Sequence, residues 1–164
     1  MVKPEMQKPF GKYYPLIVIL AVILAASIAS YSRAETTWMA TFMGLFFIIF
    51  AMFKLLDLAG FAKGFAMYDW LTKKYPPYAH LYPFIELALG LCYLSGLYPL
   101  LTNLITLLVM GVSAYGVIKA LKSGADIRCA CLGTVIDLPL STVSVIENIG
   151  MGTMAFIGLI AILF

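Results

Sequence analysis

Long apolar segments separated by short polar stretches dominate the chain, and they decide its fold class. A helix needs roughly 20 apolar residues to cross the hydrocarbon core of a bilayer. Five segments reach or approach this length, and they cover residues 15–31, 38–62, 83–100, 101–121 and 144–164. The third and fourth meet near Tyr98 and Pro99, which predicts a tight helical hairpin there. The pattern therefore predicts one all-α domain over residues 1–164, an integral membrane bundle of five transmembrane helices.

The composition supports a protein that lies almost wholly in the membrane. Hydrophobic residues make up 63% of the 164 residues and charged residues 12%, whereas soluble domains have roughly 45–50% apolar and about 25% charged residues. We therefore expect no separate soluble domain. The first segment follows lysines as a signal peptide would. Its apolar run is longer than the core of a signal peptide and no clear cleavage site follows, so we expect a retained helix.

The distribution of lysine and arginine predicts the orientation in the membrane. Cytoplasmic loops of membrane proteins carry an excess of these residues. If five helices cross, nine of the eleven basic residues fall on one side: Lys3, Lys8, Lys12, Lys63, Lys73, Lys74, Lys119, Lys122 and Arg128. This places the N-terminus in the cytoplasm and the C-terminus outside. The net charge of +3 then reflects topology, and we expect no nucleic-acid partner.

Ionisable residues inside the predicted spans are a functional signal, because a charge in the hydrocarbon core is costly without a partner or a role. Lys54 and Asp57 lie three residues apart on one helix face and can pair, or Lys54 can snorkel to the interface. Glu86 has no such local partner, which favours a buried partner such as Lys54. The predicted topology gathers these groups near the cytoplasmic face, as an intramembrane polar network of Lys54, Asp57, Glu86, Glu147 and Asn148.

Local motifs in the last two spans add two expectations. Ser144 and Glu147 have the spacing of a capping box, so Glu147 is either the cap partner of Ser144 at a helix start or a member of the network. Helices in lipid associate through small residues, which predicts close contacts at Gly111, Ser113, Gly116, Gly150, Gly152 and Gly158.

Two of the three cysteines lie in the polar segment between the last two spans, and together with Arg128 they are the candidate catalytic residues. Cys129 and Cys131 are separated by one residue and follow Arg128. Thiol–disulfide exchange fits such a pair, because a small C-x-C ring is strained and Arg128 favours the thiolate. Binding of a soft metal such as Cu(I) or Hg(II) by the two thiolates also fits, and simple loop packing is a third interpretation. Cys92, inside a span, is expected to be a small core residue.

The stretch from Gly44 to Gly96 resembles the MauE family, membrane proteins of methylamine utilisation within the broader DoxX-like group. The resemblance is carried by a helix ending in Lys-x-x-Asp, by aromatic residues after it, and by Pro-x-x-Glu opening the next helix; these are Lys54, Asp57, Phe61, Tyr68, Pro83 and Glu86. The later "CACLG" is similar to the Cys-x-Cys-phenylalanine-Gly stretch of the family, with Leu132 replacing the aromatic residue.

The resemblance implies a multi-pass bundle in the bacterial inner (plasma) membrane, with a core of four helices and a redox-associated role. Such proteins are thought to support maturation of a periplasmic quinoprotein dehydrogenase together with a thioredoxin-like partner. An electron carrier across the membrane needs thiols on both faces or a quinone, and the sequence has no second thiol pair. A quinone is therefore one candidate cofactor. A soft metal ion bound by the two thiolates is the other. The function we expect is thiol redox exchange through Cys129 and Cys131. A soft-metal transporter or chaperone and a non-catalytic scaffold subunit are the alternatives.

Overall fold

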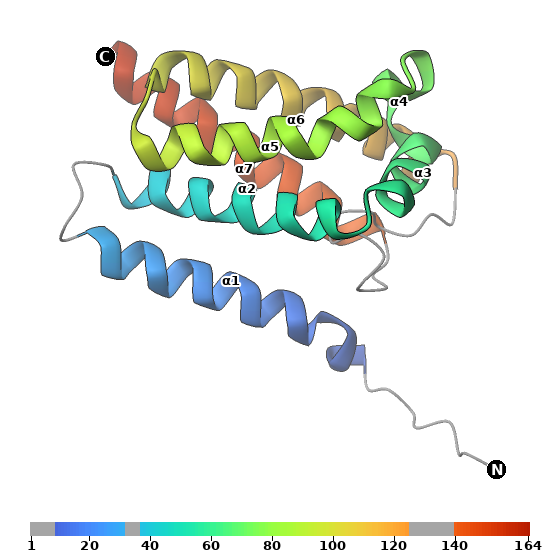
Figure 1. Cartoon of the computed structure of the whole chain (residues 1–164), viewed down its shortest axis with the longest axis horizontal. Helices are drawn as coiled ribbons and strands as arrows, with labels where there is room; N and C mark the ends of the chain where they lie inside the picture. The colour runs from blue at the N-terminus through green and yellow to red at the C-terminus, as the bar shows by residue number, and fades with distance from the viewer. Residues whose placement is uncertain (1–8, 32–36, 125–139) are drawn as a thin grey trace.

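The computed structural model describes residues 9–31, 37–124 and 140–164, and every regular element in these ranges is a helix (Figure 1). There are seven such helices: α1 (Pro9–Tyr31), α2 (Trp38–Leu56), α3 (Leu58–Tyr68), α4 (Trp70–Lys74), α5 (Pro77–Ser95), α6 (Pro99–Lys122) and α7 (Leu140–Leu163). The predicted all-α fold is confirmed.

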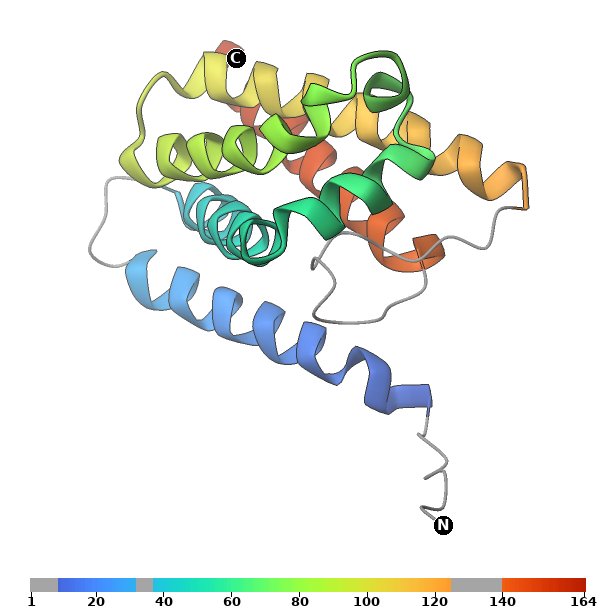
Figure 2. The same ribbon diagram turned by 45° about the vertical axis from the view of Figure 1, so that its right-hand side comes forward.

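Four helices, α2, α5, α6 and α7, form an antiparallel bundle, and the largest contacts join α2 to α5 and α6 to α7. Helix α1 packs along α2 on the outside of this bundle (Figure 1). The short helices α3 and α4 lie at the end of the bundle where α2 ends and α5 begins (Figure 2). The chain thus has the core of four helices that the resemblance implies. Helix α1 lies outside this core, and α3 and α4 cover one of its ends.

The apolar helices make the chain a multi-pass membrane protein. Within the described ranges, three helical segments are long and apolar enough to cross a bilayer: Trp38–Leu56, Pro99–Lys122 and Ser144–Leu163. Helix α1 contributes a shorter apolar stretch, Leu16–Ile28, and α5, which is 19 residues long, packs against α2. Large apolar side chains face outward, such as Leu108 and Ile146, as expected for contact with lipid. Five crossings and the orientation stay predictions.

The second predicted span, 38–62, is wrong at its end, because the helix stops at Leu56. Asp57 takes non-helical dihedral angles (φ −138°, ψ 70°), and its carboxylate accepts a hydrogen bond from the backbone N–H of Gly60 at 2.9 Å. This is an N-cap, which satisfies one of the free N–H groups of the next helix. The apolar run therefore continues as α3 in a new direction.

Two predicted helix starts are also wrong. Helix α5 begins at Pro77, so Pro83 lies inside the helix and does not open it. Helix α7 begins at Leu140, so Ser144 lies in its second turn and does not cap its N-terminus. The predicted hairpin is confirmed: Gly96 and Tyr98 both take left-handed conformations, with φ of 67° and 46°, between α5 and α6.

Close helix contacts occur at other glycines than several of those predicted. A Cβ at Gly90 would lie 2.9 Å from the carbonyl oxygen of Gly44, so α2 and α5 meet glycine to glycine. Gly116 and Gly158 do pack tightly, whereas a Cβ at Gly111 or Gly150 would meet nothing within 4 Å. The contact that binds α2 to α5 therefore comes from a pair that the spacing in the sequence does not mark.

Candidate functional site

A buried ion cluster of Lys54, Glu86 and Glu147 lies inside one end of the bundle. Lys54 is in the last turn of α2, and its Nζ lies 2.6 Å from both carboxylate oxygens of Glu86 on α5. The side chains of Lys54 and Glu86 are 3% and 0% exposed. Glu147 on α7 places Oε1 at 3.9 Å from the same ammonium. The contact expected between Lys54 and Glu86 is present, and Glu147 joins it from a third helix.

The charges of the ion cluster do not balance. Among the described residues its ion pairs contain one ammonium and two carboxyl groups. Lys54 binds Glu86 closely, and Glu147 is left at the longer distance with its Oε2 buried and without a hydrogen-bond partner. A buried polar atom without a partner is rare in folded proteins and calls for an explanation such as a proton, a water or a ligand. The cluster can thus take up one further hydrogen-bond donor.

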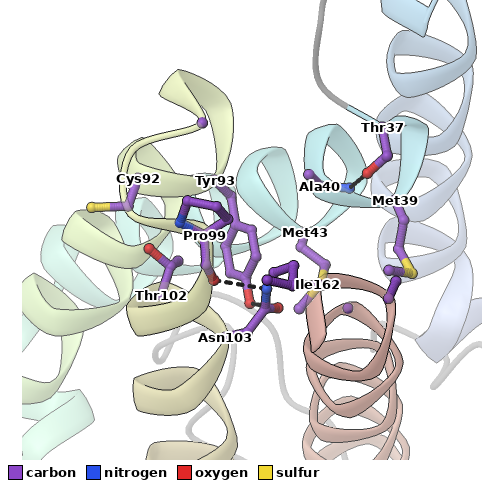
Figure 3. A pocket seen from close by; sticks show the side chains of 13 residues that line it. Thr37, Met39, Ala40, Met43, Cys92, Tyr93, Pro99, Thr102, Asn103 and Ile162 are labelled. Atoms are coloured by element: carbon purple, nitrogen blue, oxygen red, sulfur yellow. Dashed lines mark hydrogen bonds between the residues drawn. The ribbon is translucent and has the colours of Figure 1, made fainter. Parts of the chain in front are cut away.

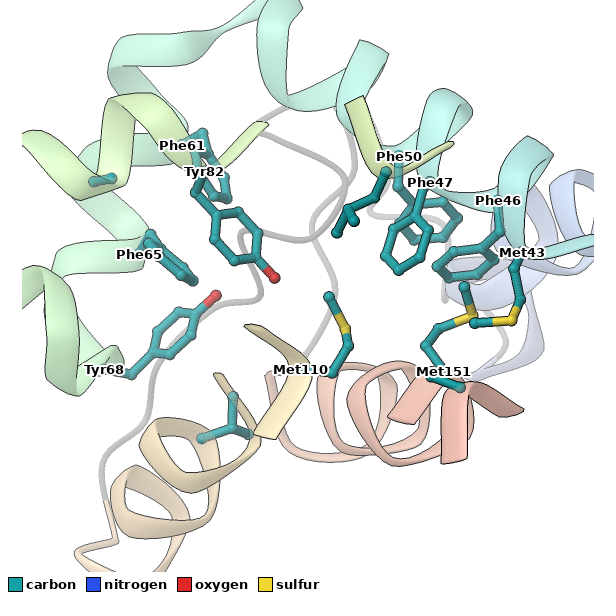
Figure 4. Packing of buried hydrophobic residues seen from close by; sticks show 14 of the residues in the cluster. Met43, Phe46, Phe47, Phe50, Phe61, Phe65, Tyr68, Tyr82, Met110 and Met151 are labelled. Carbon is teal, nitrogen blue, oxygen red and sulfur yellow. The ribbon is translucent and has the colours of Figure 1, made fainter. Parts of the chain in front are cut away.

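Aromatic side chains separate the ion cluster from the end of the bundle. We call the group Phe61, Phe65, Tyr68 and Tyr82 the aromatic cover; it comes from α3 and α5, and all four are buried. Tyr68 and Tyr82 point their hydroxyl groups toward one another across the space between the helices (Figure 4). The ammonium of Lys54 lies 5.1 Å from the ring centroid of Tyr82 and 5.6 Å from that of Phe61, within cation–π range. The cover stabilises the ammonium and excludes bulk water.

A small cavity lies between the aromatic cover and the ion cluster. Lys54, Glu147 and Asn148 line it together with Ser113 and Ser144. Its volume is about 10 Å³, which is at the lower limit for a single water molecule. Four of the five predicted network residues therefore come together here, since Glu86 binds Lys54 directly. Asn148 itself donates to the backbone oxygen of Ser144 at 2.8 Å.

The fifth predicted network residue, Asp57, has the structural role of capping α3. Tyr82 is a member of the site that the sequence analysis missed. A signal was present, because Tyr78, Tyr82 and Glu86 recur every fourth residue and so share one face of α5. Burial follows from that face, since Glu86 is fully buried.

Asp69, between α3 and α4, is a second buried carboxyl group that the sequence analysis missed. It is 0% exposed, and Oδ2 accepts a hydrogen bond from the backbone N–H of Thr72 at 2.7 Å, which caps α4. Burial raises the pKa of Asp69, although the hydrogen bonds from Thr72 and the charge of Lys73 act in the opposite direction. Gly116 of α6 packs against the backbone of Tyr68 and Asp69, so the connection between α3 and α4 lies tightly against the bundle.

The thiol pair and its neighbour, Arg128, Cys129 and Cys131, lie outside the described residues. Helix α6 ends, and helix α7 begins, at the end of the bundle where α2 ends and α3 lies (Figure 2). In the described part of the chain, no three potential ligands among His, Cys, Asp and Glu gather closely enough to hold a metal ion.

A second, larger cavity lies at the opposite end of the bundle and has a volume of about 340 Å³ (Figure 3). Cys92, half-buried on α5, lines it. Tyr93 donates from its hydroxyl to Oδ1 of Asn103 at 2.9 Å, with the hydroxyl of Thr106 at 3.1 Å, and Asn103 donates to the backbone oxygen of Pro99. These polar groups satisfy one another and tie α5 to α6, which is a structural role.

Together these features define a small multi-pass helical membrane protein that holds a Lys–Glu–Glu cluster inside its bundle. The family profile described as "Methylamine utilisation protein MauE" matches residues 32–161, and the chain belongs to this family. Family membership implies a membrane protein of methylamine utilisation and confirms the resemblance read from the sequence. No match was found among curated proteins or among solved structures.

Proposed function

We propose that this MauE-family protein is a thiol-redox component of the membrane that exchanges a disulfide with a thioredoxin-like partner. Cys129 and Cys131 are the exchanging thiols, and Arg128 favours the thiolate form of the attacking sulfur. In one direction, the thiolate attacks the disulfide of the partner and forms a mixed disulfide. The second cysteine then attacks that bond. The partner leaves as a dithiol with two electrons and two protons, and the C-x-C pair becomes a disulfide.

The observation that supports this proposal is that the ion cluster lies at the end of the bundle where α6 ends and α7 begins. Helix α6 ends at this end of the bundle and α7 begins there. Four residues lie between Gly124 and Cys129, so the chain makes five steps and the two Cα atoms are at most about 18 Å apart in any conformation. A sequence placed between these helices thus keeps its thiols within reach of the same membrane face.

The ion cluster has a supporting role in the proposal. Each round of exchange moves protons as well as electrons. Because Lys54 faces two carboxyl groups, Glu147 can hold one proton without leaving an unmatched charge in the bundle. We therefore assign Lys54, Glu86 and Glu147 as positioning residues that store a proton near the thiols. In this assignment they do not touch the partner.

Mixed-disulfide trapping tests the proposal. The probe is a thioredoxin that lacks its resolving cysteine and whose remaining active-site cysteine is activated as a mixed disulfide. It is mixed with the full chain in lipid nanodiscs. Of the variants Cys129→Ser and Cys131→Ser, the one that keeps the attacking thiol should accumulate the adduct, and the double variant should form none. Cys92→Ser is the matched control and should behave as the wild type.

Two outcomes would contradict the proposal. Equal adduct formation by the double variant and the wild type would show that the C-x-C pair is not the exchanging group. Stabilisation of the protein by Cu(I), lost in the double variant, combined with the absence of any adduct would identify the pair as a soft-metal site.

A further inference from the structure

The end of the bundle that carries α3 and α4 has a positively charged surface (Figure 1). Five exposed lysines lie on α3, on α4 and in the last turn of α6: Lys63, Lys73, Lys74, Lys119 and Lys122. The carboxyl groups described at this end have other roles. Asp57 and Asp69 cap α3 and α4, and Glu86 and Glu147 face Lys54. In the described part of the chain, no ion pair involves any of the five lysines, so their charge is available to an anionic partner.

Helix α4 gives this charge a centre with a defined geometry. Lys73 and Lys74 lie in its last turn. The ammonium of Lys74 lies 5.8 Å from the ring centroid of Trp70 and 5.9 Å from that of Tyr75. Such contacts hold an ammonium in place and leave its charge without neutralisation. Trp70 and Tyr75 are 45% and 58% exposed, and side chains of this kind prefer the boundary between lipid and water. We call these four residues the α4 site, and their composition is typical of the headgroup layer.

Exposed apolar side chains continue from the α4 site toward the interior of the membrane. Met67 lies before it on α3, and Leu81 and Phe84 follow it on α5. All three side chains are at least half exposed. A water-soluble acidic protein would contact the lysines and leave these apolar side chains uncovered. A phospholipid carries a phosphate and hydrocarbon chains in one molecule, so it can contact both kinds of side chain. The two observations together favour a lipid as the partner.

We propose that the α4 site binds the headgroup of an anionic phospholipid, with its phosphate at Lys73 and Lys74 and an acyl chain along Leu81 and Phe84. A lysine ammonium has three donors and binds phosphate as a compact charge. A zwitterionic phospholipid brings its own cation beside the phosphate, and this cation is repelled by the lysines. The site should therefore prefer the anionic lipid by roughly tenfold or more, since each basic residue at a membrane surface adds to the attraction.

The two tryptophans of the sequence allow this preference to be measured at one place. Trp70 begins α4, whereas Trp38 begins α2 at the opposite end of the bundle, and both are exposed. The full chain is reconstituted in vesicles of phosphatidylcholine and phosphatidylglycerol, in which one of the two lipids carries bromine on its acyl chains and quenches nearby tryptophan fluorescence. In Trp38→Phe, which reports from Trp70, phosphatidylglycerol should quench in preference to phosphatidylcholine. In Trp70→Phe, which reports from Trp38, the two lipids should quench equally.

Charge variants made in the Trp38→Phe background locate the site. Lys73→Gln/Lys74→Gln should abolish the preference for phosphatidylglycerol, and Lys73→Arg/Lys74→Arg should keep it because the charges remain. Lys63→Gln/Lys122→Gln is the matched control, since it removes the same number of charges from α3 and α6 and should keep the preference. All of these lysines are exposed, so the variants should retain the helix content of the wild type in circular dichroism.

Two outcomes would overturn the proposal. Equal quenching of Trp70 by both lipids would show that the α4 site does not select an anionic lipid, and would leave its lysines to an acidic partner protein. Equal loss of the preference in Lys73→Gln/Lys74→Gln and in Lys63→Gln/Lys122→Gln would show a diffuse attraction set by net charge, without a site on α4.

The lipid preference is independent of thiol exchange and of orientation. The vesicles carry both lipids in both leaflets, so the result does not depend on the side of the membrane that α4 faces. The variant Cys129→Ser/Cys131→Ser should show the same preference as the wild type. A failure of the thiol proposal therefore leaves this one standing, and the reverse also holds.

Discussion

Removing the ammonium of Lys54 should be the most damaging single change in the ion cluster. In Lys54→Met, two buried carboxyl groups face each other across the bundle without a cation, and Glu86 loses both of its 2.6 Å contacts. Breaking a buried ion pair by removing one partner costs about 3–5 kcal/mol. We expect a loss of this size in the free energy of unfolding.

The same charge count gives the opposite expectation for Glu147. Glu147→Met removes the surplus carboxyl group and leaves the one-to-one pair of Lys54 and Glu86. Replacing a buried charge by an apolar side chain of similar volume is often neutral, so the change should stay within about 1 kcal/mol of the wild type. Glu86→Gln should fall between the two, because Lys54 keeps Glu147 at 3.9 Å.

The assay is reversible unfolding in mixed micelles, followed by circular dichroism, with all variants in one lipid and detergent mixture. Lys63→Met is the control, since Lys63 is an exposed lysine on α3 and its replacement should change stability by less than about 0.5 kcal/mol. A loss for Glu147→Met as large as that for Lys54→Met would refute the charge count. So would a loss for Lys63→Met equal to that for Lys54→Met.

Three further predictions test the packing, the buried carboxyl group outside the spans, and the orientation. Gly90→Ala should lower the free energy of unfolding by about 1–3 kcal/mol, because its Cβ would lie 2.9 Å from a backbone oxygen, whereas Gly111→Ala should not destabilise. Burial raises the pKa of Asp69 above its ordinary 3.8, so between these two values the folded state keeps a proton that the unfolded state loses. The melting temperature of the wild type should therefore fall relative to that of Asp69→Asn as the pH rises from 3.8 through the raised pKa. A difference that stays constant over this range would contradict the prediction. A membrane-impermeant thiol reagent should label Cys129 and Cys131 in inverted vesicles and not in intact cells, and the reverse pattern would show the opposite orientation.

The sequence predicted those features that depend on the cost of polar groups in lipid. The hairpin at Tyr98 follows from two apolar segments that meet at a proline, where the missing N–H falls in the first turn of α6. The contact between Lys54 and Glu86 follows because neither charge is stable in the bilayer alone. Such arguments use only the kind of residue and its position in an apolar run.

Features that depend on the direction of a helix face could not be predicted in the same way. The run from Trp38 to Ala62 is apolar on both sides of Asp57, so its hydropathy did not distinguish a helix break from an ionisable residue inside one span. Gly44 and Gly90 meet across two helices, and no spacing along one helix reveals such a pair. The third partner of the cluster, Glu147, also had a local interpretation as a cap, which the start of α7 at Leu140 removed.

The position of Lys54 in the last turn of α2 has a consequence for biosynthesis. The lysine leaves the ribosome 32 residues ahead of Glu86, and at the end of its helix its long side chain can keep the ammonium among the lipid headgroups. Glu86 lies in the third turn of α5 and enters the bilayer when its counter-charge is already in place. In a chain with the two residues exchanged, the lysine would lie at the deeper position in α5 and the shorter glutamate at the end of α2. The lysine would then have to enter the bilayer after the glutamate. The order of synthesis therefore favours the arrangement that the protein has.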